Sequence, residues 1–210
     1  MGLERTDEEL LAAYRHGDAG AFELLLRRHR APLFTFLLRM LNDRERAEDL
    51  AQEAFLRVIK SAQDWEERAR FQTWLYTIAR NLCVDASRRD HHRRADSLDA
   101  EGPQGESPMV DSVPSPGIDP ARGAASARLR PLLEKALLAL PAEQREVFVL
   151  RELGGVAFKE IAEIVRANEN TVKSRMRYAL EGLRKALAAA GIDADVASVD
   201  AADAGSVRRA

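Results

Sequence analysis

Apolar positions in the first part of the chain recur at the spacing of amphipathic helices. Thr6 and Glu9 have the spacing of a capping box, which predicts the start of a short helix. Asp18 can cap a second helix, in which apolar side chains recur every three or four residues over 22–40. A bend in this second helix is predicted at Pro32.

A third helix is predicted from the turn signal at Asn42 and Asp43 to about Ser61. At 100° per residue, its alanines and Val58 gather on one side. The opposite side mixes carboxylates with one leucine and carries Glu45, Asp49, Gln52, Glu53, Leu56 and Lys60. Such a face suits docking onto a partner protein. A solvated helix face with one stray leucine is the alternative that the pattern leaves open.

The next helix is predicted to begin near Phe71, after the polar residues 63–68. Its predicted buried stripe is apolar and consists of Phe71, Trp74, Leu75, Ile78 and Leu82. The predicted opposite face carries Thr73, Tyr76, Thr77, Arg80, Cys83 and Ser87. Aromatic rings stack on bases and guanidinium groups follow phosphates, so this face suits single-stranded nucleic acid. Alternatively, Trp74 and Tyr76 are core and boundary residues.

The spacing over 128–190 predicts a helix-turn-helix. Pro131 and Pro141 are predicted in the first turns of two short helices. A further short helix follows with Phe158, Ile161, Ala162 and Val165 buried, and a four-residue break over 167–170 leads to a longer helix. The longer helix is predicted to bury Val172, Met176, Ala179, Leu180, Leu183 and Leu187. Its polar face suits the major groove of DNA, and a generic amphipathic hairpin is the alternative.

Composition adds a division of the chain into segments with different charge. The 210 residues are 46% hydrophobic and 31% charged, as in a globular protein of one or two small domains. Five of the eight prolines fall within 99–123, which has no hydrophobic period. The formal net charge of −2 conceals a basic segment, 128–190, with 12 basic against 8 acidic side chains. Residues 97–127 carry 1 against 5, and 191–210 carry 2 against 4.

Several classes of protein are excluded by what the sequence lacks. No apolar run approaches the roughly 20 residues of a membrane span, and the N-terminus is charged, so we expect a cytoplasmic protein. The single cysteine, Cys83, excludes an intramolecular disulfide framework and a Cys-cluster zinc site. His91 and His92 lie near Asp85 and Asp90 but lack metal-ligand spacing. We therefore predict no enzyme activity, no metal and no cofactor.

These patterns predict an all-α fold of two small helical domains joined by a flexible acidic linker. The first domain is predicted over 1–96 and the linker over 97–127. The second domain, over 128–190, contains the helix-turn-helix, and 191–210 is predicted to be a disordered tail.

Four stretches, in order, resemble the sigma-70 superfamily of bacterial RNA polymerase sigma factors, and specifically its two-domain extracytoplasmic-function (ECF) group. They are AEDLAQEAFLRV (47–58), FQTWLYTIARNLCVDASRR (71–89), LPAEQREVFVLRELGG (140–155) and FKEIAEIVRANENTVKSRMRYALEGLRKAL (158–187). They cover most of the chain outside the predicted linker and tail. A chance helix-turn-helix would not also bring the first two stretches, so the match is specific.

The resemblance implies roles for particular residues. Docking on the clamp helices of core RNA polymerase would fall to Asp49, Gln52, Glu53 and Leu56. The melted −10 element of promoter DNA would be held by Trp65, Tyr76, Arg80, Asn81, Arg88 and Arg89. The duplex −35 element would be read by Thr171, Lys173, Ser174, Arg177 and Tyr178. The resemblance further implies an anti-sigma protein as a partner, and association with the nucleoid when the chain is bound to polymerase.

The turn of the helix-turn-helix departs from the pattern of the relatives. They commonly have Gly, then Pro-x-Gly, where this chain has Arg166, Asn168 and Asn170. Asn tolerates left-handed backbone and caps helices, whereas Arg166 fits such backbone less well and is a candidate phosphate contact instead. A stand-alone helix-turn-helix transcription regulator remains the alternative function. Such a regulator would not need residues 45–89.

Overall fold

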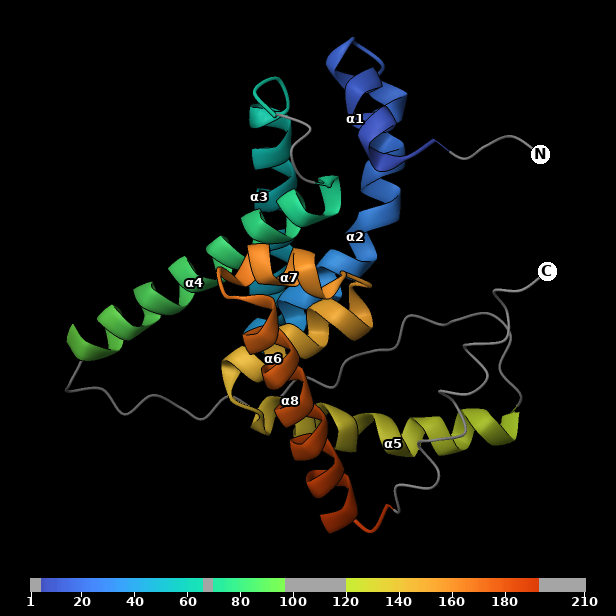
Figure 1. Cartoon of the computed structure of the whole chain (residues 1–210), viewed down its shortest axis with the longest axis vertical. Coiled ribbons are helices and arrows are strands. Elements are labelled where there is room, and N and C mark those ends of the chain that lie inside the picture. The colour runs from blue at the N-terminus through green and yellow to red at the C-terminus, as the bar shows by residue number, and fades with distance from the viewer. Residues whose placement is uncertain (1–4, 66–69, 97–119, 193–210) are drawn as a thin grey trace. The chain divides into compact units, whose positions relative to one another are not determined.

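The computed structural model describes residues 5–65, 70–96 and 120–192, of which 90–96 and 120–128 are described as backbone only. Every regular element within these residues is helical, which confirms the predicted all-α fold class (Figure 1). The chain forms two compact units. The first contains α1–α4, η1, α7 and the start of α8 to Lys173, and the second contains α5, α6 and α8 from Ser174.

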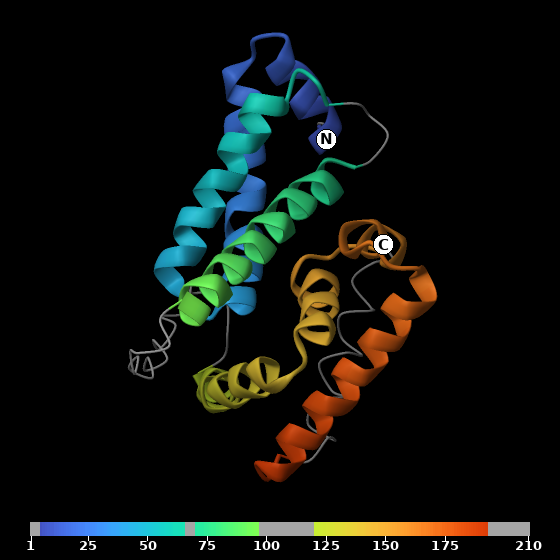
Figure 2. The same cartoon turned by 90° about the vertical axis from the view of Figure 1, so that its left-hand side faces the viewer.

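The first four helices have the bounds α1 (Asp7–Arg15), α2 (Ala19–Leu41), α3 (Arg44–Ser61) and α4 (Phe71–Asp96). The central helix α2 packs against the other three, and Figure 2 shows α2 and α3 side by side with α4 crossing beside them. Their core is closed by aromatic and leucine side chains, chiefly Phe36, Phe71, Tyr76, Leu25, Leu33 and Leu75. Burial of this apolar surface stabilises the bundle.

Short polar side chains begin and end these helices where the sequence predicts. Thr6 and Glu9 form the capping box of α1, with each side chain accepting a hydrogen bond from the other residue's backbone N–H at 3.2 and 2.7 Å. Asp18 caps α2, and Asp43 caps α3. Asn42 separates α2 from α3 in left-handed backbone at φ 52°, which asparagine tolerates better than most residues.

The predicted faces of α4 were wrong in part. Tyr76, Thr73 and Cys83 were expected opposite the apolar stripe, but all three are buried. The ring of Tyr76 meets Phe36 of α2 edge-on at a centroid distance of 5.3 Å. Gly154, in the same unit, approaches so closely that an added Cβ would lie 3.0 Å from the Tyr76 hydroxyl oxygen. A helix covered on two sides buries both sides, and a single-stripe pattern cannot show this.

The remaining elements are α5 (Pro120–Ala139), α6 (Ala142–Phe148), a π-helical turn η1 (Val149–Leu153), α7 (Phe158–Val165) and α8 (Glu169–Ala189). The core of the second unit joins α5 to α8. Ala136 and Leu137 of α5, with Leu140 just after its end, pack against Ala179 and Leu183 of α8. An added Cβ at Gly182 would lie 2.7 Å from a methyl carbon of Leu140, so the absence of a side chain there permits the close approach.

Helix α5 begins earlier than the sequence pattern predicts. Pro131 was expected in the first turn of a helix, but it lies inside α5, which starts at Pro120. The helix therefore includes residues 120–127 of the predicted linker, whose other residues, 97–119, lie outside the described ones, as does the predicted tail beyond Ile192. The sequence of 121–127 is rich in alanine and has no apolar stripe. Helix propensity without amphipathic spacing leaves no hydrophobic period from which this part of the helix could be predicted.

Candidate functional site

The outer face of α3 combines acidic, amide and apolar side chains. Asp49 and Gln52 are exposed, and Leu56 keeps 48% of its surface exposed. Ile59, which the sequence interpretation did not single out, is 40% exposed and follows Leu56 by three residues on the same side. We refer to Asp49, Gln52, Glu53, Leu56 and Ile59 as the α3 stripe. Two large apolar side chains within reach of carboxylates are a feature of protein-docking surfaces.

Glu53 is the half-buried member of the α3 stripe. Its carboxylate accepts a hydrogen bond from Nε of Arg57 at 2.9 Å, one helical turn further along. Both side chains of this pair keep more than a third of their surface in water, so the pair contributes little to stability. Glu53 can therefore exchange this partner for a cation on another protein at small cost.

The basic residues of α4 lie toward the end of its described side chains. Arg88 and Arg89 are exposed, and Nε of Arg89 donates to the backbone carbonyl of Asp85 at 3.3 Å. Arg80 and Asn81 are half-buried about two turns earlier. These four polar side chains leave a cationic, hydrogen-bonding surface on α4, as phosphates require.

Two aromatic residues with predicted roles at the −10 element lie in the interior. Trp65 is 7% exposed and its ring packs against Trp74 of α4 at a centroid distance of 6.0 Å. Tyr76 is 1% exposed, and burial raises its pKa to about 12. In this structure neither ring presents a face on which a base could stack. The aromatic and basic residues along α4 made Tyr76 a candidate, and the resemblance to sigma factors made Trp65 one, but neither signal carries information about depth.

The turn of the predicted helix-turn-helix is present between α7 and α8. Arg166 ends α7 in left-handed backbone at φ 54°, ψ 48°, the conformation that the sequence left in doubt for this residue. The N–H of Ala167 then donates to the carbonyl of Ala162 at 3.0 Å. Asn168 caps α8, because its side-chain oxygen accepts the N–H of Thr171 at 2.8 Å. Asparagine thus performs the capping role predicted for it.

The N-terminal half of α8 exposes a mixed basic and polar face. Lys173, Ser174 and Arg177 are exposed, Tyr178 is 48% exposed, and Thr171 is half-buried. The guanidinium of Arg177 lies over the Tyr178 ring at 5.0 Å and donates to its hydroxyl at 3.3 Å. The structure therefore brings all five residues predicted for the −35 element onto the first turns of one helix, with no acidic side chain between Thr171 and Tyr178.

Leu180 is a second error of the periodic pattern. It was predicted in the buried stripe of α8, yet it is 46% exposed. Its neighbours at the predicted spacing, Met176, Ala179 and Leu183, are buried. The predicted stripe of six apolar residues is wider than the face that α8 buries, so Leu180, at the edge of the stripe, remains in water.

The described residues contain no group of three or more His, Cys, Asp or Glu side chains placed to hold a metal ion. The side chains of Asp90, His91 and His92, on which the enzyme alternative rested, lie outside the described ones. No helix within the described residues has the length and apolar character needed to cross a membrane.

Comparisons with known proteins agree with this geometry. Residues 25–94 match the family Sigma-70 region 2, and residues 130–183 match Sigma-70, region 4. The ECF RNA polymerase sigma factor SigW of Bacillus subtilis (strain 168) is 30% identical over 188 residues, which cover 88% of this chain and 98% of SigW. The ECF RNA polymerase sigma-E factor of Escherichia coli (strain K12) is 28% identical over 187 residues, covering 87% and 95%.

Solved structures share the fold. The sigma factor RpoE from Bartonella quintana, in complex with the anti-sigma factor NepR, has a TM-score of 0.62 at 25% identity and covers 79% of this chain and 96% of its own. CnrH, in complex with the cytosolic domain of CnrY, has a TM-score of 0.62 at 22% identity, covering 87% and 97%. The helical fold and the two family matches together define the class of protein as a transcription initiation factor. The chain belongs to the sigma-70 family and, within it, to the ECF group.

Proposed function

We propose that this chain directs core RNA polymerase to specific promoters. In this proposal the helix-turn-helix binds the −35 element as duplex, and α4 holds the melted −10 element as single strand. In this proposal the chain acts by binding, and the binding energy of unpaired DNA drives strand opening. The observation that carries the proposal is the presence of both the basic face of α8 and the α3 stripe in one chain.

The α3 stripe is the proposed docking surface for core polymerase. Its carboxylates, Asp49 and Glu53, would meet cations on the polymerase, while Leu56 and Ile59 would be buried against it. A stand-alone helix-turn-helix regulator, the alternative function, has no use for such a stripe. The stripe therefore distinguishes the two functions experimentally.

Contact with the −10 strand is proposed for the polar residues of α4. Arg88 and Arg89 are exposed and reach phosphates most readily, with Arg80 and Asn81 beside them. Trp65 and Tyr76 contribute by packing in the interior of the first unit rather than by stacking on bases. The −35 contacts are proposed for Thr171, Lys173, Ser174, Arg177 and Tyr178 of α8.

We also propose an anti-sigma protein as a regulatory partner. RpoE of Bartonella quintana, which shares the fold at 25% identity, was solved in complex with an anti-sigma factor. An anti-sigma protein that covers the α3 stripe or the face of α8 would block polymerase or promoter binding.

The proposed function is tested by mixing the purified chain with core RNA polymerase. We expect co-elution in gel filtration and promoter-dependent transcription from a DNA library with randomised −35 and −10 elements. Failure of either result contradicts the proposal, and sequence-specific duplex binding without co-elution favours the stand-alone regulator.

The docking surface is tested by charge reversal. Replacing Asp49 and Glu53 with lysine should abolish co-elution while circular dichroism shows unchanged helix content. Glu23→Lys, which reverses an exposed carboxylate on α2, is the matched control and should co-elute normally. Retained co-elution of the Asp49→Lys, Glu53→Lys variant would remove the α3 stripe from the interface.

A further inference from the structure

We propose that α1 is a positioning helix for the −10 contact surface, and that Glu8 and Arg15 are its positioning residues. This inference rests on the proposed function. Glu8 holds Phe71, the first residue of α4, which carries the proposed −10 contacts, and Arg15 holds the backbone of Trp65 between α3 and α4. Neither Glu8 nor Arg15 needs to touch DNA for this role.

Glu8 fixes the start of α4. Its Oε1 accepts a hydrogen bond from the backbone N–H of Phe71 at 2.9 Å, across 63 positions of sequence. The first N–H groups of a helix have no partner within the helix, and the helix dipole places partial positive charge there. A carboxylate from another helix therefore supplies the cap that a local Ser, Thr or Asp would ordinarily provide.

Arg15 holds the backbone of the segment that follows α3. Its Nη1 donates to the carbonyl of Trp65 at 3.3 Å, and its Nη2 donates to the carbonyl of Gln63 at 3.1 Å. The side chain of Gln63 donates in return to the carbonyl of Arg15 at 3.4 Å. Because the planar guanidinium donates from two of its nitrogens, it fixes the direction of this backbone as well as its distance.

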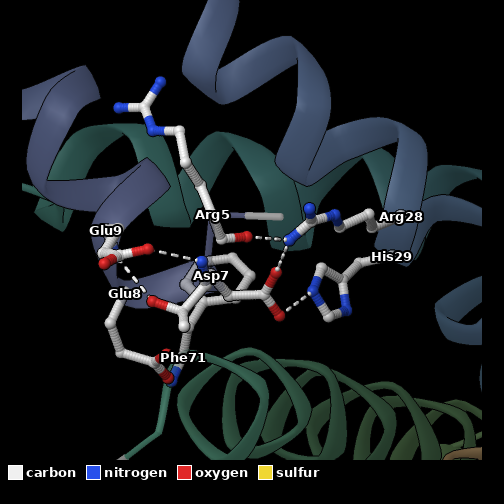
Figure 3. A network of polar contacts seen from close by, with 8 residues as sticks. Arg5, Asp7, Glu8, Glu9, Arg28, His29 and Phe71 are labelled. Carbon is white, nitrogen blue, oxygen red and sulfur yellow. Dashed lines mark hydrogen bonds and ion pairs between the residues drawn. The ribbon is translucent and has the colours of Figure 1, made fainter. Parts of the chain in front are cut away.

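A second set of contacts holds α1 against α2. Figure 3 shows the Asp7 carboxylate between Arg28 and His29, with Oδ1 at 2.9 Å from Nη1 of Arg28 and Oδ2 at 2.6 Å from Nε2 of His29. The His29 ring in turn packs against Phe71 at a centroid distance of 5.2 Å. Asp7 thus places Glu8 beside the start of α4, and the contact does not depend on Glu8 alone.

Trp65 and the start of α4 are consequently both held by one short helix. Glu8 and Arg15 are seven residues apart, which is about 10 Å along a helix at 1.5 Å per residue. Trp74 of α4 contacts both held residues, with its ring centroid 6.0 Å from that of Trp65 and 6.1 Å from that of Phe71. Preorganised contacts reduce the ordering cost of capturing a flexible strand, so loosening them should weaken strand capture without altering duplex binding.

The test uses the full chain in complex with core polymerase, on the best promoter that the wild-type chain selects from the randomised library. The variants are Glu8→Ala and Arg15→Ala, and the matched controls are Glu23→Ala and Arg27→Ala, which break an exposed ion pair on α2. Glu8→Gln retains an acceptor for the Phe71 N–H and serves as the conservative variant. Opening is followed by the fluorescence of 2-aminopurine placed in the −10 element.

We expect Glu8→Ala and Arg15→Ala each to slow opening by about tenfold, the scale of one lost charge-assisted hydrogen bond. Glu8→Gln should restore most of the rate, and −35 duplex binding and co-elution should be unchanged. The chain has two tryptophans; Arg15 holds the backbone of Trp65, and Trp74 packs against Trp65, so Arg15→Ala should also shift their emission.

Opening at the wild-type rate in both alanine variants would overturn the inference. Equal losses of opening, −35 binding and co-elution would also overturn it, because they would show a purely structural role. If the wild-type chain itself fails to open promoters with core polymerase, the proposed function fails. The wild-type control thus separates this failure from a failure of the inference about Glu8 and Arg15.

Discussion

The ring of Tyr76 on α4 meets the ring of Phe36 on α2 edge-on, with centroids 5.3 Å apart and an interplanar angle of 83°. The Tyr76 hydroxyl is buried and has no hydrogen-bond partner among the described residues. Edge-to-face packing stabilises the pair, whereas the unpaired hydroxyl is a cost.

Tyr76→Phe should therefore raise the free energy of unfolding, by about 1 kcal/mol at neutral pH, because it keeps the ring and removes the buried hydroxyl. Burial raises the pKa of Tyr76 to about 12, above its ordinary value of 10.0. The unfolded chain thus releases this proton at lower pH than the folded chain, and wild-type stability should fall between about pH 10 and 12. Urea unfolding of both proteins across this range checks the expected divergence. A less stable Phe variant would contradict it.

Asp7→Asn should make the chain less stable at neutral pH and less sensitive to acid. Burial raises the pKa of Asp7, but hydrogen bonds and charge from His29 and Arg28 outweigh this, so the net pKa is lowered below 3.8. The stabilisation is present above the unfolded value of 3.8 and is lost as pH falls through the folded pKa. We expect a difference of about 1–2 kcal/mol at neutral pH that disappears in acid. Thermal unfolding from pH 7 to 2 measures it, with exposed Asp64→Asn as control.

Arg166→Gly should stabilise the turn between α7 and α8. Left-handed backbone costs a residue with a Cβ about 1–2 kcal/mol, and glycine avoids this cost. The greater freedom of glycine in the unfolded chain offsets about 0.5–1 kcal/mol of the gain. Arg166→Ala loses the same charge but keeps the strain, so it should be about 1 kcal/mol less stable than the glycine variant. If Arg166 contacts phosphate, both variants should lose DNA affinity equally. Equal stability of the two would argue against strain at this position.

Arg177→Ala should reduce discrimination at the −35 element or weaken duplex binding by about 1–3 kcal/mol, provided that its guanidinium meets a base edge. The side chain now rests on Tyr178 and is exposed, so it can swing onto DNA at little cost. Fluorescence anisotropy with selected and scrambled −35 duplexes measures the change. Arg184→Ala, at an exposed position further along α8, should leave selectivity intact. Unchanged selectivity of the Arg177 variant would remove this residue from the readout.

The sequence predicts the helices of this chain better than their faces. Thr6, Asp18, Asp43 and Asn168 all cap helices as their types and positions indicate, because capping depends on groups within a few residues. Periodicity assigned the sides of α3 correctly, since α3 exposes one face. It failed for Tyr76, because α4 is covered on more than one side.

The candidate surfaces show the same division. Lys173, Arg177 and Tyr178 lie together on α8 because they share one helix, so their grouping followed from sequence spacing alone. Ile59 belongs to the α3 stripe because it is 40% exposed in the folded chain, which its sequence position did not indicate. The contacts of Glu8 with Phe71 and of Arg15 with Trp65 join positions 63 and 50 residues apart, and no local pattern signals them.

The sequence by itself determined the family, the helical fold, the caps and the basic face of α8, because each depends on residue types at short spacing. Tertiary structure decided that Tyr76 and Trp65 are interior, that Leu180 remains exposed, and that α1 holds Trp65 and the start of α4. Burial and long-range hydrogen bonds depend on which helices meet. That is a property of the packed chain rather than of any single segment.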